Sequence, residues 1–263
     1  MISNLQVRLM RLELTLQKER LAPMYITSQR CTPVTEEMLA EVERAAQVRF
    51  PEWYRAFVHT YGEGTYRNWM NVQRPDDEVL KPFAEYELWE HDADSPITEA
   101  QIAGCISLGT STDGDFLAVH PDVEGLLWLP RHDDRIRVIQ PVGETYADLL
   151  DAIHAQVYQR SDEAPRWFEP WHEARTHAFY LFPKNQPHPS LTQLSHTARE
   201  RWQPDLIIED EYGCKLFYRA LGGYLRFNYA NETEVALIAD GDTPPLKAEM
   251  ENWLSDTGGQ RMK

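Results

Sequence analysis

The chain has 263 residues, of which 42% are hydrophobic, and it carries a formal net charge of −16. This length allows one large or two ordinary domains, and this apolar content supplies a core, which argues against bulk disorder. A binder of the phosphate backbone needs a basic face, so we expect no nucleic-acid partner. Residues 31–160 hold 10 Lys/Arg and 24 Asp/Glu, a net of −14, and therefore carry most of the charge. Such acidity suits a soluble protein and also a protein that meets a basic partner.

Three cysteines lie far apart in the sequence, and no two of them form a Cys-x-x-Cys motif: Cys31, Cys105 and Cys214. An odd number of scattered thiols favours a reducing compartment and gives no zinc signature. Arg8 and Arg11 interrupt the apolar stretch near the N-terminus, which is not the pattern of a signal peptide. No apolar run approaches the length of a membrane span. We therefore expect a cytoplasmic protein without a membrane partner.

The N-terminal segment, residues 1–33, allows two interpretations. Leucines within residues 4–22 are spaced both for a helical stripe and for an alternating strand, and residue propensity favours the helix. Residues 22–34 contain two prolines and are typical of a linker.

Two helices are predicted next. Thr35 caps the first, which has two glutamates in its first turn, where the helix dipole favours anions. The second runs from Pro51 to Tyr61, and Gly62 stops it with the chemistry of a left-handed C-cap. Because their link is short, the two helices must be antiparallel or sharply angled.

Residues 106–134 are predicted to form an antiparallel meander of three strands, because their apolar runs are separated only by short turn clusters. These turns are too short for a crossover helix. A fourth strand is predicted at 135–140, and a capped amphipathic helix at 145–157 closes the unit. The order of elements predicts an α+β domain over residues 34–160.

Between the helices and the meander, residues 63–104 give weaker patterns. Residues 68–72 suggest a strand, and residues 78–89 suggest a helix that carries Phe83, Tyr86 and Trp89. The same region is dense in acid, with carboxylates at Asp76, Asp77, Glu78, Glu85, Glu87, Glu90, Asp92 and Asp94.

A linker is predicted near residues 160–170, and a second small α+β domain follows over residues 165–257. Its predicted order is β-α-β-β-β-β-α, and it resembles no family that we can name. The predicted strands are 177–182, 205–209, 214–219, 224–229 and 235–239, and the predicted helices are 190–202 and one that starts at 243.

No catalytic motif is complete. The turn at 109–115 has the glycine spacing of a phosphate loop, but Asp115 stands where that loop needs a lysine, and a carboxylate repels phosphate. His132 and Asp133 are adjacent, yet no nucleophile motif accompanies them. Acids of the meander turns are candidate calcium or magnesium ligands, but their spacing fits no EF-hand, and Asp and Gly favour turns for backbone reasons. We therefore predict no catalytic residue, no metal site and no cofactor, and we expect a protein that is not an enzyme.

Aromatic residues give two kinds of signal. Trp53, Phe57 and Tyr61 stand at helical spacing, which favours core packing. Trp69 and Trp89 lie in the acidic and least regular region, where an aromatic anchor among charges is typical of an interface hot spot. Core packing remains the alternative for these two tryptophans as well.

The motifs together form a pattern. A helix VTEEMLAEVERAA leads to FPEWYRAFVHTYGEG, and after an insert follow CISLGTSTDGDFLAVH, EGLLWLPRHDD and ETYADLLDAI. This combination resembles the SUKH superfamily, which includes the yeast cell-wall-assembly regulator domain and many bacterial immunity proteins. The resemblance covers about residues 34–158. The departures are Glu63 within the glycine turn and a long acidic insert around 74–98.

The resemblance implies a mainly antiparallel sheet flanked by helices and a protein-binding module. Many bacterial members neutralise a toxin by capping it, which implies a cognate, basic, secreted toxin as the partner. The candidate partner-binding residues are Trp69, Asp76, Asp77, Glu78, Trp89, Asp92, Asp94, Asp113, Asp115, Asp133 and Asp134. Two alternatives remain: a regulatory scaffold like the yeast relatives, and, least favoured, a metal-dependent hydrolase. The oligomeric state and the role of the second domain stay open.

Overall fold

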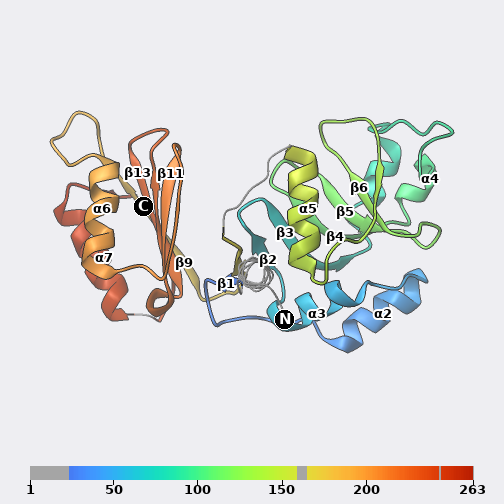
Figure 1. Cartoon of the computed structure of the whole chain (residues 1–263), viewed down its shortest axis with the longest axis horizontal. Coiled ribbons are helices and arrows are strands. Elements are labelled where there is room, and N and C mark those ends of the chain that lie inside the picture. The colour runs from blue at the N-terminus through green and yellow to red at the C-terminus, as the bar shows by residue number, and fades with distance from the viewer. Residues whose placement is uncertain (1–23, 159–164, 243, 263) are drawn as a thin grey trace, which may run out of the picture.

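The computed structural model describes residues 24–158, 165–242 and 244–262. Figure 1 shows two domains side by side, each built from a sheet with helices packed on it. The predicted α+β class is therefore confirmed. The N-terminal stretch 4–22, for which the sequence left helix and strand open, lies outside the described residues.

The sheet of the first domain has eight strands in the order β1-β8-β2-β3-β4-β5-β6-β7. Neighbouring strands are antiparallel except β1 and β8, which are parallel. The predicted meander is present as β4, β5 and β6, with β7 as the fourth strand. The bounds are β1 (Tyr25–Ile26), β8 (Trp167–Pro170), β2 (Gly64–Tyr66), β3 (Met70–Asp76), β4 (Ile106–Ser111), β5 (Phe116–Val119), β6 (Leu126–Leu129) and β7 (Arg137–Ile139).

Three helices cover one face of this sheet: α2 (Glu36–Ala46), α3 (Glu52–Tyr61) and α5 (Tyr146–Tyr158). Thr35 caps α2 as predicted, because its side chain accepts a hydrogen bond from the backbone N–H of Met38. Gly62 ends α3 with φ 70°, and a Cβ there would lie 2.1 Å from the carbonyl oxygen of Thr32, so only glycine fits. The core under the helices includes Tyr54, Phe57, Met70, Leu117, Trp128 and Leu150.

The opposite face of the sheet is covered by residues 77–104, which contain only a short 3₁₀ helix η1 (Lys81–Glu85) and the one-turn α4 (Glu99–Ile102). The predicted helix at 78–89 was therefore wrong. Glu87 has φ 48°, which a right-handed α-helix does not allow, and this turn brings Trp89 down onto the strands. Burial of irregularly spaced apolar residues has overridden helical propensity here.

The first sheet extends further along the chain than the sequence indicated. Strand β8 pairs with β2 and with β1, although residues 165–170 were interpreted as the linker and the start of the second domain. These strands are short and their partners are distant in sequence, so no local pattern predicts the pairing.

The sheet of the second domain has six strands in the order β10-β11-β12-β13-β9-β14. Helices α6 (Leu191–Trp202) and α7 (Pro244–Asp256) pack on one face of it, and a 3₁₀ turn η2 (Arg219–Leu221) joins two strands. The predicted order β-α-β-β-β-β-α is present, with one short strand added. The bounds are β9 (Arg175–Leu181), β10 (Leu206–Glu209), β11 (Gly213–Tyr218), β12 (Gly223–Asn228), β13 (Glu234–Asp240) and β14 (Gln260–Arg261).

The two sheets meet through an aromatic cluster. Tyr25 of β1 and Trp167 of β8 pack against Phe217 and Tyr224 of the second sheet, with ring centroids 5.1–6.3 Å apart. Ala236 and Ile238 are buried in the same cluster. The free face of the second sheet is therefore partly covered by the first domain.

Polar contacts reinforce this junction. Arg175 of β9 donates to Glu169 of β8, with nitrogen–oxygen distances of 2.9 and 3.1 Å, and its Nη1 lies 3.4 Å from Asp240 of β13. Ser28 donates to the second carboxylate oxygen of Asp240 at 2.8 Å. A buried guanidinium thus links carboxylates from both sheets. No helix in the described part of the chain is long and apolar enough to cross a bilayer.

Candidate functional site

The acidic insert, residues 76–94, forms an outer layer on the first domain with its apolar side chains turned inward. Leu80, Phe83 and Trp89 pack on the β5–β6 side of the sheet. Eight Asp/Glu and one Lys lie in this segment, and all eight acids are exposed. A buried apolar side therefore holds a strongly acidic outer side in place.

Several acids of the insert also shape its backbone. One carboxylate oxygen of Asp76 accepts from the N–H groups of Glu78 and Val79, at 2.8 and 2.9 Å. Asp92 does the same for the N–H of Asp94 at 3.0 Å. These short-range bonds are the turn chemistry expected of aspartate. The second oxygen of Asp92 lies 3.9 Å from the Arg135 guanidinium, and that of Asp76 makes no hydrogen bond in the described chain.

The β6–β7 loop joins this surface. The backbone N–H of Glu90 donates to the carbonyl oxygen of Asp134 at 2.8 Å. The guanidinium of Arg135 lies 3.7 Å from Glu90 and 3.9 Å from Asp92. Asp133 pairs with Arg137 and accepts from the N–H of Arg135. The structure thus brings Asp133 and Asp134, predicted from a separate motif, next to the acids of the insert.

Trp89 and Trp69 differ from their predicted role as exposed anchors. Each side chain is only 6% exposed. Trp89 belongs to the core under the insert, and its indole N–H donates to the carbonyl oxygen of Pro130 at 2.7 Å. Trp69 packs on the helix side of the sheet against His154 and Tyr158. The alternative of core packing describes both tryptophans, because neither presents a surface to a partner.

Asp113 and Asp115 hold the β4–β5 turn. Asp115 is buried, and its carboxylate accepts from the hydroxyl of Ser111 at 2.6 Å and from the N–H of Arg131 at 2.8 Å. Asp113 is exposed and accepts from the hydroxyl of Tyr158 at 2.6 Å. Burial and this hydrogen bond raise the pKa of Tyr158. Asp115 is therefore a structural residue, and its predicted role in partner binding is corrected.

The sequence interpretation missed the aromatic residue that is exposed among the acids. Tyr86 is 58% exposed and stands between Glu85 and Glu87. Its ring contacts Phe83 edge to face, with centroids 5.7 Å apart, so it is supported from below. The sequence shows Tyr86 between two glutamates, but the predicted helix did not indicate which of its aromatic rings is exposed to solvent.

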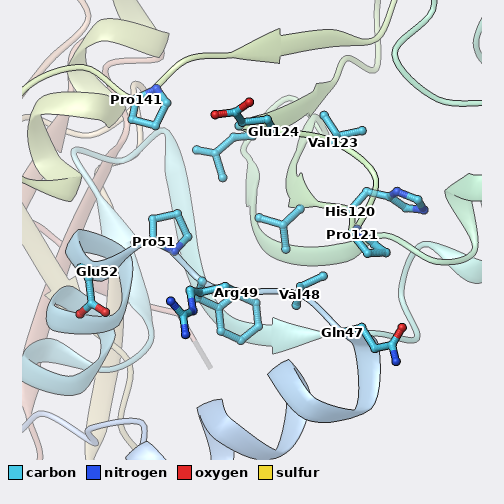
Figure 2. Close-up of a pocket in the computed structure, with 14 residues that line it drawn as sticks. Gln47, Val48, Arg49, Pro51, Glu52, His120, Pro121, Val123, Glu124 and Pro141 are labelled. Carbon is cyan, nitrogen blue, oxygen red and sulfur yellow. The ribbon is translucent and has the colours of Figure 1, made fainter.

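A pocket of about 460 Å³ opens at one end of the same domain. Figure 2 shows the α2–α3 link, with Val48 and Arg49, opposite the β5–β6 loop, with Pro121, Val123 and Glu124. Its walls are mostly apolar and carry three charged side chains, Arg49, Glu52 and Glu124, which is the composition of a site for a side chain or a small molecule. The two walls are far apart in sequence, so no motif indicated the pocket.

The pocket adjoins α4 through His120 and Asp122. The ring Nδ1 of His120 accepts from the N–H of Asp122 at 3.2 Å, and Gln101 of α4 donates to the Asp122 carboxylate at 2.9 Å. Burial lowers the pKa of His120, while the Asp122 carboxylate opposes the shift. His120 is therefore neutral near pH 7 and acts as an acceptor here.

Residues 33–151 match the model of the SMI1 / KNR4 family (SUKH-1). The chain carries a SUKH domain. The matched range contains α2, α3, the meander and the acidic insert, so the candidate surface lies within the SUKH domain. No curated protein and no solved structure shows significant similarity to the chain.

The SUKH domain is generally a non-catalytic binding domain. In the described part of the chain, no three His, Cys, Asp or Glu side chains gather into a group able to hold a metal ion. What this surface offers chemically is a dense array of carboxylates with an exposed tyrosine, an arrangement suited to Arg and Lys side chains of another protein.

Proposed function

We propose that this protein is a bacterial immunity protein, which binds a basic cognate toxin in the cytoplasm and neutralises it by capping. The observation that carries the proposal is the outer side of the SUKH insert, where eight exposed carboxylates are accompanied by two cations, Lys81 of the insert and Arg135 of the β6–β7 loop. Secreted toxins that act on nucleic acid need basic clefts. An acidic cap is steered toward such a cleft and pairs with its cations.

The shape of the insert supports a preformed cap. Trp89 and its apolar neighbours fix the insert to the sheet, and Asp76 and Asp92 fix its turns. A surface that is ordered before binding loses less conformational entropy when the partner arrives. Tyr86 supplies the rigid aromatic contact that protein interfaces favour.

The test is a charge reversal on this surface. Asp77, Glu85 and Asp94 have exposed side chains and make no side-chain hydrogen bond or ion pair within the described chain, so replacing all three by lysine spares the fold. The toxin encoded beside the gene is co-expressed with the wild type or with this triple variant. We expect the wild type to co-purify with the toxin and restore growth, and the variant to lose both.

A matched control carries the same change of net charge elsewhere. Glu173, Glu200 and Asp256 are exposed on the second domain, and their replacement by lysine should leave binding intact. The complex should also weaken as salt is raised, because exposed ion pairs are screened. If the insert variant binds with unchanged affinity and salt dependence, the insert is not the toxin-binding surface.

A second candidate function is a regulatory scaffold. The second domain favours it, because a domain fixed to the SUKH sheet by the aromatic cluster is suited to hold a second protein in a defined orientation. The two functions are distinguished by a pull-down with the wild-type protein in cells that have no toxin gene next to this gene. Recovery of a partner protein from such cells favours the scaffold. Rescue of growth that is lost when the charges of the insert are reversed favours immunity.

A further inference from the structure

The second sheet ends in a strand that is open along one side. Strand β10 pairs only with β11 in the described part of the chain, in continuous register from Leu206 opposite Phe217 to Glu209 opposite Cys214. A strand at the edge of a sheet presents unpaired N–H and C=O groups on its outer side. Edge strands are usually blunted by proline, lysine or a bulge, and β10 contains no proline or lysine.

Both faces of β10 carry apolar side chains that are incompletely covered, and Glu209 shares the face of Ile207. Leu206 and Ile208 are partly buried against the aromatic cluster between the domains. Ile207 points to the opposite face, where its partner Leu216 lies under α6, yet Ile207 is 40% exposed. A further strand beside β10 would extend both apolar layers at once, since its side chains alternate between the same two faces.

Each end of β10 carries an aspartate whose carboxylate accepts hydrogen bonds from backbone N–H groups. Asp205 precedes β10, accepts from the N–H of Arg219 at 2.7 Å and has its carboxylate near that guanidinium. Asp210 follows the strand and accepts from the N–H groups of Tyr212 and Gly213, at 2.8 and 2.9 Å, so the turn that closes the hairpin is fixed. Glu211 is exposed beside it.

These charges decide what kind of segment fits. Two copies of β10 paired antiparallel about Ile207 would place Asp205 of one copy opposite Glu209 of the other. Arg219 and Arg199 offset part of these two charges, but Asp210 and Glu211 add two further acids at the end of the strand. Like charges brought together destabilise a strand pair. Self-association through this edge is thus disfavoured. An incoming strand with lysine or arginine at its ends places opposite charges at the same positions.

We propose that the free edge of β10 binds an extended segment of a partner protein, apolar in the middle and basic at both ends, by adding it as a seventh strand. Main-chain hydrogen bonds to β10 supply affinity, and the apolar positions beside Ile207 and beside Leu206 and Ile208 supply selectivity. This surface belongs to the second domain and does not depend on the toxin-binding role of the SUKH insert.

The test uses the full chain and synthetic peptides. The probe is a capped six-residue peptide with lysine at both ends and alternating valine and isoleucine between them. The first control peptide has glutamate at both ends, and the second has proline at two central positions. Binding is followed by amide hydrogen exchange with residue resolution.

We expect the lysine peptide to slow exchange of amides within residues 205–210 by about tenfold or more, and neither control peptide to do so. Ile207→Lys places a cation on the edge and should weaken binding by about tenfold or more. The matched control is Val138→Lys, since Val138 is 37% exposed on β7, an edge strand of the other sheet. This variant should bind as the wild type does.

Several outcomes overturn the proposal. The edge is already occupied if the amides of β10 that face outward are fully protected in the free chain. The binding is only electrostatic if the proline peptide binds as well as its parent, or if protection appears on the acidic insert instead. Absence of protection at millimolar peptide, or an equal effect of Val138→Lys, contradicts strand addition at this edge.

Discussion

The indole N–H of Trp89 donates to the carbonyl oxygen of Pro130, with 2.7 Å between the two heavy atoms. This bond ties the acidic insert to the end of β6, directly before the loop that carries Asp133 and Asp134. The acids of the insert and those of the loop therefore form one surface because a buried aromatic ring holds both segments.

Replacing Trp89 by phenylalanine keeps much of the apolar bulk but leaves the Pro130 carbonyl without its donor. An unsatisfied buried acceptor costs about 1 to 3 kcal/mol, so we expect the free energy of unfolding to fall by that amount. Urea denaturation measures it. Tyr86→Ala is the control, because Tyr86 is exposed and a surface substitution changes stability by about 0.5 kcal/mol or less. Equal losses in the two variants would contradict a structural role for the Trp89 bond.

The sequence predicted the elements whose signals are local. Thr35 and Gly62 mark helix ends by capping chemistry, and each lies where the structure begins or ends a helix. The meander was equally accessible, because apolar runs and the turn residues between them are recognised within a few positions.

What the sequence did not predict depends on contacts between distant residues. The insert lacks a helix because Leu80 and Trp89 must reach the sheet, and propensity over 78–89 does not contain that constraint. Strand β8 joins β1 and β2 through pairings to residues about 100 to 140 positions away. The negative charge of the candidate surface was predicted, because the acidic residues can be read from the sequence. Its exposed aromatic residue, Tyr86, was not predicted.

Gly62 gives a test of backbone strain at the end of α3. Its φ of 70° and ψ of −152° lie in a region that residues with a Cβ rarely adopt, and the added Cβ would meet the Thr32 carbonyl. We expect Gly62→Ala to lower the free energy of unfolding by about 1 to 3 kcal/mol or more. Thermal denaturation measures the loss. The control is Gly104→Ala, where φ is ordinary and the nearest atom is a side-chain nitrogen of His120 at 3.2 Å. An unchanged midpoint of thermal unfolding for Gly62→Ala would show that the backbone at the end of α3 relaxes without cost.

Arg175 offers a test of the junction between the domains. Its guanidinium lies between Glu169 of the first sheet and Asp240 of the second, and all three side chains are largely buried. Replacement by methionine leaves two buried carboxylates without this cation, which costs about 3 to 5 kcal/mol for a broken buried pair. Arg201→Met is the control, since Arg201 pairs with Glu249 at the surface and such pairs contribute about 1 kcal/mol or less.

Denaturation followed separately in the two domains gives a second readout for Arg175→Met. Because the aromatic cluster and Arg175 both hold the junction, weakening one is expected to separate the transitions of the two domains. If Arg175→Met unfolds in one transition with wild-type stability, the ion pairs do not couple the domains.

Lys215 makes the stability of this junction depend on pH. Its ammonium lies 4.5 Å from the Trp167 ring centroid and 5.4 Å from that of Tyr224, and it donates to the side-chain oxygen of Asn68 at 3.1 Å. Burial lowers the pKa of Lys215 to about 8, against 10.5 for the free group. Between these two values the unfolded chain binds more protons than the folded chain, so stability attributable to Lys215 rises with pH.

The prediction concerns the difference in the free energy of unfolding between variants, because several buried tyrosines have raised pKa values and also change stability at high pH. Burial raises the pKa of Tyr224 and Tyr66, among others, and these groups lower stability above about pH 10 in every variant alike. We expect the free energy of unfolding of the wild type, minus that of Lys215→Met, to increase steadily from pH 8 to pH 10. Lys184→Met is the control, since Lys184 is exposed and its difference should stay flat. Urea titrations at four pH values measure all three proteins. A flat difference for Lys215→Met would show that water reaches the ammonium, and that the aromatic cluster does not desolvate it.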